Sequence, residues 1–239
     1  VIAGRNAILE AIKSGREINK ILFQEGIEKG RLKSIFAIAN EKKIICQEVP
    51  KRKLDNSTTE RHQGVIAYVA PYSYFELDEV VNNLEINKDT TLLILDHIED
   101  PHNLGAIIRT AEASGVKAII IPKRRAAVVS QTAVKASAGA IEHMPVIRVS
   151  NLTDAIKKLK EKGFWIAGTT LAERSEDYTK IAKDVPLAIV IGNEGEGMSK
   201  VVTNECDFLY HLPMLGKIQS LNASVAAGII MYERIKSND

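Results

Sequence analysis

Residues 1–70 alternate between stretches with helical spacing of apolar residues and short continuous apolar runs. Helical spacing predicts helices, and apolar runs bounded by polar or turn-forming residues predict strands. The predicted helices are 5–13 and 32–40, and the predicted strands are 18–23, 43–49 and 65–70. This order is typical of a small mixed α/β module.

The pattern breaks after residue 70. Residues 71–74 (Pro-Tyr-Ser-Tyr) interrupt the apolar periodicity, and residues 82–91 are polar and rich in turn formers. We therefore expect a linker over 71–90, which joins a front domain, 1–70, to a second domain, 91–239.

Continuous apolar strands alternate with amphipathic helices through the second domain. Asn151 is a suitable N-cap and Gly163 a suitable stop for one of these helices. The predicted strands are 92–95, 118–121, 144–149, 164–169, 187–191 and 208–212, and the predicted helices are 104–114, 130–137, 152–162 and 222–235. Such alternation predicts the α/β class, with a mostly parallel sheet and helices on both faces.

Charge is distributed unevenly along the chain, although the formal net charge is only +2. Residues 1–70 hold 13 Lys and Arg against 8 Asp and Glu, a net +5, whereas residues 71–239 hold 19 against 22, a net −3. A basic front ahead of an acidic body fits a front domain that contacts a polyanion. An ordinary solvated surface explains the charge equally well.

Residues that commonly bind metals are scattered. The five His show no metal-ligand spacing, and Cys46 and Cys206 lie far apart, so we expect neither a metal site nor a disulfide. No apolar run is long enough to span a bilayer, and residues 1–4 do not resemble a signal peptide. We therefore expect a cytoplasmic protein with no membrane partner.

Three loops that follow predicted strands are dense in Gly, Asn, Pro or Ser, and ligands of open α/β sheets bind at such places. The first loop leads into the 104–114 helix, with Asn103 near its N-cap. Arg109 lies inside this otherwise apolar helix, where it needs solvent or an anionic partner. Taken by itself, a surface Arg or a structural ion pair is the simpler interpretation.

The second loop, residues 192–199, reads Gly-Asn-Glu-Gly-Glu-Gly-Met-Ser. A phosphate-binding P-loop needs Lys at the position of Met198, and the dinucleotide fingerprint has the reverse glycine spacing. Two carboxylates also repel polyphosphates but suit a cationic sulfonium donor. The glycines allow a ligand to approach the backbone closely.

The third loop ends in Ser220 and Asn222, either of which can cap the final helix. Capping by itself explains both residues. A further loop carries the basic run Lys123-Arg124-Arg125, which is either a solvated surface or a phosphate contact.

Together and in this order, the three loops resemble the signature motifs of the SpoU (TrmH) family of RNA 2′-O-methyltransferases, in the SPOUT superfamily. The matching stretches are 103–115, 189–199 and 212–226. Residues 3–7 (AGRNA) and 62–65 (HQGV) resemble the start and end of the family's substrate-binding domain, a small α/β domain similar to ribosomal protein L30e. The layout is most similar to the branch that methylates a guanosine of 23S ribosomal RNA.

The resemblance implies that S-adenosylmethionine is the methyl donor, that the C-terminal domain holds a deep trefoil knot, and that the protein is a homodimer that binds RNA. It implies that the site is completed across the dimer interface. The implied donor-binding residues are Thr169, Gly192, Asn193, Gly195, Leu212, Met214, Ser220, Leu221 and Ala223, and the implied catalytic residues are Arg109, Asn103, Glu194, Ser220 and Asn222.

An Arg side chain stays protonated in nearly all settings, which makes Arg109 a poor base. We therefore expect Arg109 to clamp the adjacent phosphate and to stabilise the developing alkoxide. Asn103 is expected to orient the hydroxyl or Arg109. Glu194, Ser220 and Asn222 are expected to shape the site and to hold Arg109.

Three other functions stay open at this point. One is methylation of transfer RNA by an enzyme of the same family, and another is RNA binding without catalysis. The intact pair Asn103 and Arg109 argues against the second. The third, a nucleotide-binding enzyme, is disfavoured by the failed P-loop and dinucleotide matches. The sequence does not name the target nucleotide.

Overall fold

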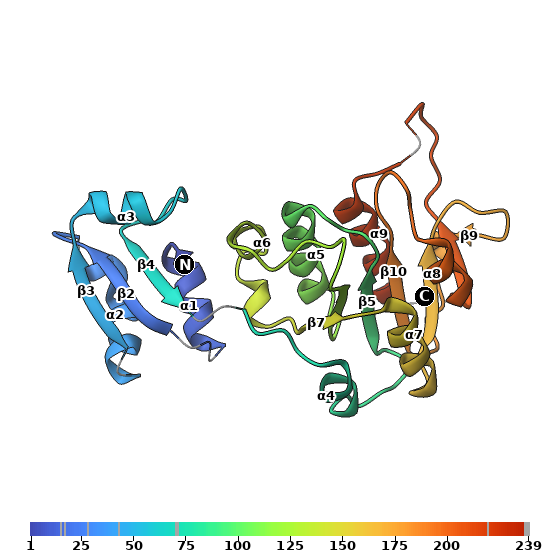
Figure 1. Cartoon of the computed structure of the whole chain (residues 1–239), viewed down its shortest axis with the longest axis horizontal. Helices are drawn as coiled ribbons and strands as arrows, with labels where there is room; N and C mark the ends of the chain where they lie inside the picture. Colours follow the sequence, from blue (N-terminus) through green and yellow to red (C-terminus); the bar gives the residue numbers. More distant parts are fainter. Residues whose placement is uncertain are drawn as a thin grey trace. The chain divides into compact units, whose positions relative to one another are not determined.

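The computed structural model of the chain describes residues 1–14, 16, 18–27, 29–42, 44–69, 72–218 and 220–236. The chain divides into two units, Val1–Ser73 and Tyr74–Asp239, each with its own sheet (Figure 1).

The first unit is built on a four-stranded sheet in the order β1-β4-β2-β3. Its strands are β1 (Ile2–Ala3), β2 (Ile18–Gln24), β3 (Ile45–Val49) and β4 (Val65–Val69), and its helices are α1 (Arg5–Lys13), α2 (Lys33–Glu41) and α3 (Lys51–Ser57), with a 3-10 turn at Lys29–Leu32. β2 runs parallel to β3 and antiparallel to β4. The predicted α/β module is confirmed, but β1 and α3 were not predicted. The predicted ends at Lys43 and Ala70 fall outside the described residues.

The second unit is built on a seven-stranded sheet in the order β7-β6-β5-β10-β8-β11-β9. Its strands are β5 (Thr91–Leu95), β6 (Ile119–Pro122), β7 (Val146–Val149), β8 (Trp165–Thr169), β9 (Glu176–Asp177), β10 (Leu187–Ile191) and β11 (Phe208–His211). Every neighbouring pair is parallel. The carboxyl ends of all these strands therefore lie at one edge of the sheet.

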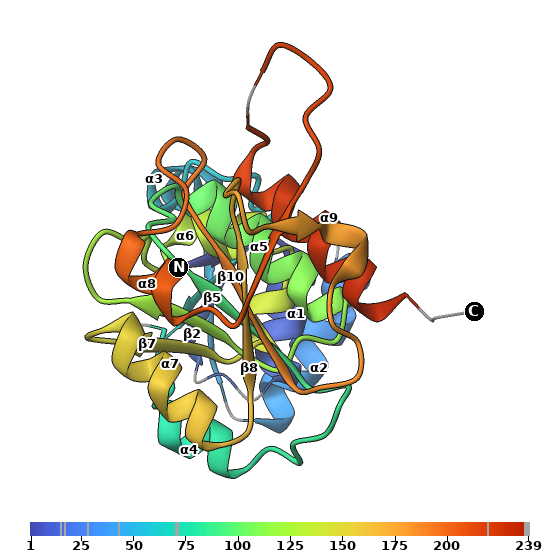
Figure 2. The ribbon, with the colours of Figure 1, turned by 90° about the vertical axis from the view of Figure 1, so that its right-hand side faces the viewer.

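Helices cover both faces of this sheet, as predicted. They are α4 (Leu77–Asn82), α5 (Pro101–Ala113), α6 (Gln131–Ala136), α7 (Leu152–Glu161), α8 (Lys200–Glu205) and α9 (Ala223–Ile235), with 3-10 turns at Ala140–Glu142 and Tyr178–Lys180. Figure 2 shows α5 and α9 on one side of the sheet and α7 and α8 on the other. The core under α4, α7 and α8 is formed by alternate residues of the strands, such as Leu92, Ile94, Ala188 and Val190.

The segment expected to be a polar linker, 71–90, contains a helix near its middle. It contains α4, because Leu77, Val80, Val81 and Leu84 are apolar at helical spacing. Leu77 and Val81 are 7% and 4% exposed and pack into the core beneath α7. This part of the expected linker therefore packs with the second unit, and the polar residues around its short apolar stripe obscured the helix in the sequence.

Candidate active site

Three loops meet at the carboxyl edge of the parallel sheet. They follow β5, β10 and β11, which carry the three sequence motifs. β5 and β10 are direct neighbours, and β8 separates β10 from β11. Parallel strands deliver their following loops to the same edge, which is where open α/β sheets bind ligands.

One carboxylate joins the three loops. Glu194 Oε1 accepts hydrogen bonds from Asn103 Nδ2 at 2.8 Å, Asn222 Nδ2 at 2.7 Å and the backbone N–H of Ala223 at 2.9 Å. Asn222 Nδ2 also donates to Asn103 Oδ1 at 2.9 Å. The structure therefore brings together three of the five predicted catalytic residues.

Local capping places two of these side chains. The N-cap of α5 is Asp100, whose carboxylate accepts from the His102 N–H at 2.8 Å, and Pro101 is the first helical residue. Asn103 lies near the N-cap, as expected, in the first turn of α5, where its amide reaches Glu194. The helix itself begins at Pro101, earlier than the predicted start at 104. Asn222 does cap α9, as one of the two predicted candidates, by accepting from the N–H groups of Ser224 and Val225.

The glycine-rich loop after β10 depends on Gly192. A Cβ added there would lie 2.4 Å from the carbonyl carbon of Gly197, because Asn193 and Gly197 pair through two 3.0 Å backbone hydrogen bonds. Gly197 has a φ of +68°, which favours glycine. A Cβ at Gly195 meets nothing closer than Asn193 Oδ1 at 3.5 Å. The conformational need for glycine thus lies at Gly192 and Gly197, not at Gly195.

A buried aspartate that the sequence analysis missed supports this loop. Asp96 is 1% exposed and directly follows β5. Its Oδ2 accepts from the Ser199 N–H at 2.7 Å, and its Oδ1 lies 2.8 Å from His97 Nδ1. Asn193 Nδ2 donates to the His97 carbonyl at 3.0 Å. The signal in the sequence was a polar residue directly after a fully apolar strand. In the structure, Asp96 connects the loop after β5 to the loop after β10.

A pocket of about 390 Å³ opens between these loops. It is lined by all nine predicted donor-binding residues, namely Thr169, Gly192, Asn193, Gly195, Leu212, Met214, Ser220, Leu221 and Ala223. Glu194 and Glu196 add negative charge to its wall. The volume is typical of small-molecule sites, and apolar, main-chain and acidic surfaces together suit a cationic organic ligand.

Arg109 does not line this pocket. It is exposed on α5, and the structure gives its side chain no hydrogen bond or ion pair with any described residue. Arg109 is six positions after Asn103 in α5. That step is about 9 Å along the helix axis and places the two side chains on different faces of the helix. We expected Glu194, Ser220 and Asn222 to hold the Arg109 side chain in place, but none of them contacts it within a single chain.

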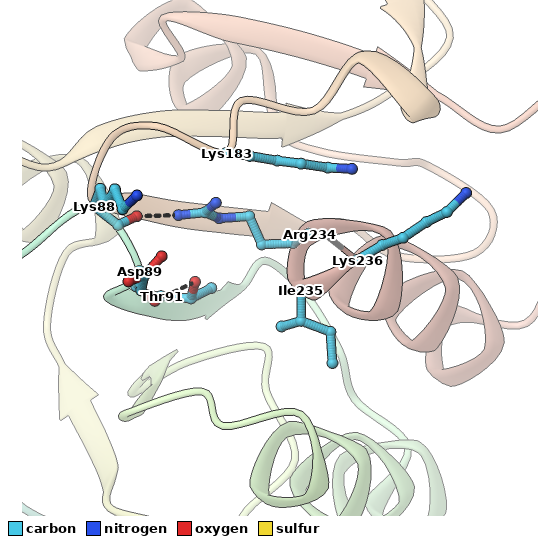
Figure 3. A pocket seen from close by; sticks show the side chains of 7 residues that line it. All are labelled: Lys88, Asp89, Thr91, Lys183, Arg234, Ile235 and Lys236. Atoms are coloured by element: carbon cyan, nitrogen blue, oxygen red, sulfur yellow. Dashed lines mark hydrogen bonds between the residues drawn. The ribbon is translucent and has the colours of Figure 1, made fainter. Parts of the chain in front are cut away.

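A second hollow, of about 540 Å³, lies at the opposite edge of the sheet, where β5 begins (Figure 3). Four of its lining residues are cationic: Lys88, Lys183, Arg234 and Lys236. Arg234 is buried at the end of α9 and donates to the carbonyls of Lys88 and Val185, so it fastens the segments before β5 and β10. Burial lowers the pKa of Arg234. These contacts explain Arg234 structurally.

Within the described part of the chain, no group of three or more His, Cys, Asp or Glu side chains could hold a metal ion. None of the helices in that part combines the length and the apolar character needed to cross a bilayer.

Comparison with known families places both units. Residues 90–232 match the model described as "SpoU rRNA Methylase family", and residues 1–75 match the model described as "RNA 2'-O ribose methyltransferase substrate binding". A Staphylococcus saprophyticus protein named as a TrmH family tRNA/rRNA methyltransferase is 54% identical over 234 residues, covering 98% of this chain and 94% of that protein.

Solved structures are similar over nearly the whole chain. An rRNA methyltransferase from Sinorhizobium meliloti, solved with AdoMet bound, has a TM-score of 0.84 at 27% identity and covers 97% of this chain and 85% of its own. The SpoU methyltransferase AviRb from Streptomyces viridochromogenes has a TM-score of 0.82 at 25% identity, with coverage of 98% and 87%.

Proposed function

Because this chain belongs to the SpoU (TrmH) family and is an S-adenosylmethionine-dependent RNA methyltransferase, we propose that its three-loop pocket holds the donor while a ribose 2′-hydroxyl of RNA is methylated beside it. The observation that carries this proposal is the contact of Glu194 with both Asn103 and Asn222 at the mouth of a pocket lined by all the expected donor residues.

The pocket fits the donor. S-adenosylmethionine supplies a methyl group carried on a positively charged sulfur. Gly192 lets the backbone of Gly197 and Met198 pack closely against it, which shapes the loop that lines the pocket. The pocket's apolar wall includes Leu212 and Leu221. Glu194 and Glu196 offset the positive charge of the donor. Main-chain groups around Gly192 and Leu212 can recognise the adenine and methionine portions without a charged phosphate site.

The chain's own polar groups orient the acceptor. Asn103 Nδ2 gives one hydrogen to Glu194, and its second hydrogen is available to the ribose hydroxyl. Glu194 and Asn222 fix the plane of that amide and so act as positioning residues. Arg109 clamps the neighbouring phosphate and stabilises the negative charge that develops on the hydroxyl oxygen as its proton passes to water. As the oxygen–methyl bond forms, the sulfur–methyl bond breaks and the donor leaves as the neutral thioether S-adenosylhomocysteine.

Arg109 serves the pocket of a partner subunit in this proposal. It is exposed and away from the pocket of its own chain. α9 presents an apolar stripe at helical spacing, formed by Val225, Ile229 and Tyr232, which are 49%, 36% and 51% exposed. Such patches commonly mark protein interfaces. A homodimer formed through α9 would cover the stripe and complete the site across the interface.

Ribosomal RNA is the proposed substrate, with a guanosine of 23S RNA as the target and transfer RNA as the alternative. The support for ribosomal RNA is the match of residues 90–232 to the SpoU rRNA methylase family, together with the rRNA methyltransferases among the structural neighbours. The relatives named for both tRNA and rRNA support the alternative as well. Family membership also supports the deep trefoil knot and a cytoplasmic location.

Methyl transfer is tested with tritiated S-adenosylmethionine and unmodified transcripts of 23S ribosomal RNA and transfer RNA. Alkaline hydrolysis needs a free 2′-hydroxyl, so ribose methylation leaves the label in alkali-resistant dinucleotides. Label in those dinucleotides supports the proposal and identifies the RNA class. Label released only in mononucleotides, as from base methylation, would contradict it.

A further inference from the structure

Three consecutive cations follow β6 at the carboxyl edge of the catalytic sheet. Lys123, Arg124 and Arg125 are exposed, and their side chains make no hydrogen bond or ion pair with any residue that the structure describes. Their charges are therefore available to a ligand. We call residues 123–125 the basic loop.

The main chain around the basic loop is held in place. The Lys123 N–H donates to the Val149 carbonyl at 2.8 Å, and an Arg148 guanidinium nitrogen donates to the Lys123 carbonyl at 3.1 Å. Arg148 also lies over the ring of Tyr74, 5.1 Å from its centroid. These contacts fix the loop's start, so its cations are presented from a preorganised backbone.

Arg125 adopts a φ of +52°, which is uncommon for a residue with a Cβ. Backbone strain of this kind tends to persist where surrounding contacts impose it, and it gathers at functional sites. Two residues later, the Ala127 N–H donates to the Ile98 carbonyl at 2.7 Å, and the Val129 N–H donates to Tyr74 Oη at 2.9 Å. The loop is thus fastened at its end as well as at its start.

The bond to Ile98 ties the end of the segment that carries the basic loop to the segment that leads into α5. Ile98 belongs to the segment between β5 and α5 that leads to Asn103. The preceding residue, His97, is held by Asn193 of the glycine-rich loop. One run of hydrogen bonds, from Ala127 to Ile98 and from the Asn193 amide to His97, therefore links the segment of the basic loop to the start of α5 and to the loop that lines the donor pocket.

The acidic residues around the donor pocket oppose the approach of RNA phosphates. Glu194 and Glu196 line the pocket and repel RNA phosphates. The segment beside the basic loop carries Glu99 and Asp100, and Asp100 is occupied by the cap of α5. Cations nearby lower the electrostatic cost of bringing the phosphates that flank the target ribose to this acidic pocket.

We propose that the basic loop is a phosphate-binding element of the catalytic unit, which holds the RNA backbone next to the target nucleotide. This rests on the proposed function. The loop grips phosphodiester groups without reading bases, so it contributes affinity and position rather than sequence choice.

The test compares two variants of the full-length protein. The first combines Lys123→Ala, Arg124→Ala and Arg125→Asn, since Asn tolerates a positive φ better than Ala. The control is Lys117→Ala, because Lys117 is exposed just before β6, at the opposite end of the same strand. Arg124→Ala alone serves as a milder second variant. Thermal melting and S-adenosylmethionine affinity check that each variant is folded.

Affinity is measured across a salt series for a random-sequence single-stranded RNA and for a 23S ribosomal RNA transcript. The triple variant should bind both at least about tenfold more weakly, with a salt slope reduced by about 0.7 for each phosphate that is no longer neutralised. Lys117→Ala should bind like the wild type. Unchanged affinity and slope in the triple variant would overturn the proposal. If the triple variant binds RNA more weakly but the wild-type protein transfers no methyl group, the loop's role is kept and the proposed activity is contradicted.

Discussion

Asn103 and Asn222 are 119 residues apart in the chain, yet their side-chain amides bond directly, with Asn222 Nδ2 donating to Asn103 Oδ1 at 2.9 Å. Each also donates to Glu194 Oε1. The first turn of α5, the loop after β10 and the cap of α9 are joined by this one cluster. A shift of any of the three elements therefore displaces the amide assigned to the acceptor hydroxyl.

Glu194→Ala should reduce kcat for methyl transfer about 100-fold, because small displacements of positioning groups have effects of that size. Its melting temperature should change little, since the side chain is exposed and water can replace its partners. Glu196→Ala is the matched control: Glu196 lines the same pocket but its side chain has no hydrogen bond to a described residue. Equal losses in the two variants would show that the charge matters and the cluster does not.

Gly192→Ala should weaken S-adenosylmethionine binding by at least about tenfold, because the new Cβ would collide with the backbone of Gly197 and Met198. Gly195→Ala should bind the donor nearly as well as the wild type, since the space there is ordinary. Calorimetry on both variants checks this. The opposite order of affinities would mean that the donor contacts Gly195 more closely than the loop geometry indicates.

The sequence predicts well where local chemistry decides the structure. Asn151 and Gly163 bound α7 as expected, and Asn151 accepts the Thr153 N–H. The helix start at Asp100 was misplaced because the Asp-Pro signal competes with Asn103, and both are acceptable caps. The helix α4 was missed because it is short and surrounded by polar residues.

Long-range order is where local patterns fail. β10 lies between β5 and β8, although it follows both in the chain, and only that order brings Glu194 to Asn103. No periodicity encodes it; the family resemblance supplied the site residues instead. The place of Arg109 outside its own pocket also could not be read from spacing, because it depends on which face of α5 is left exposed.

Truncation should show that α4 belongs to the catalytic unit. A fragment beginning at Tyr74 should fold and bind S-adenosylmethionine. A fragment beginning at Thr91 loses the buried Leu77 and Val81, each worth about 1.5–3 kcal/mol, and should be clearly less stable in urea. Identical unfolding midpoints would mean that residues 74–90 act only as a linker.

Cys206 should resist alkylation. Burial, with a smaller effect of the Asp207 carboxylate, raises the pKa of its thiol to about 12, and the thiolate is the reactive form. Because this pKa is raised above that of the unfolded chain, the stability it contributes is present at neutral pH and is lost as pH rises toward 12. Iodoacetamide at pH 8 should modify the exposed Cys46 first, as read by mass spectrometry. Equal rates at the two thiols would contradict this.

The three-loop pocket and Arg109 of a partner subunit together form one methyl-transfer site in the proposed mechanism. Arg109→Ala should bind S-adenosylmethionine normally but lose about 10²–10³ in rate. Gly192→Val should retain Arg109 but lose the donor pocket. Differently tagged copies of these two inactive variants allow mixed dimers to be purified and assayed with tritiated donor and RNA.

In the mixed dimer, the intact pocket of the Arg109→Ala subunit faces the intact Arg109 of the Gly192→Val subunit. If the site is shared between subunits, one of the two sites in the mixed dimer is complete and the other is not. The mixed dimer should then transfer methyl groups at about half of the wild-type rate. A mixed dimer as inactive as its two parents would contradict a shared site, as would near wild-type turnover by Arg109→Ala itself.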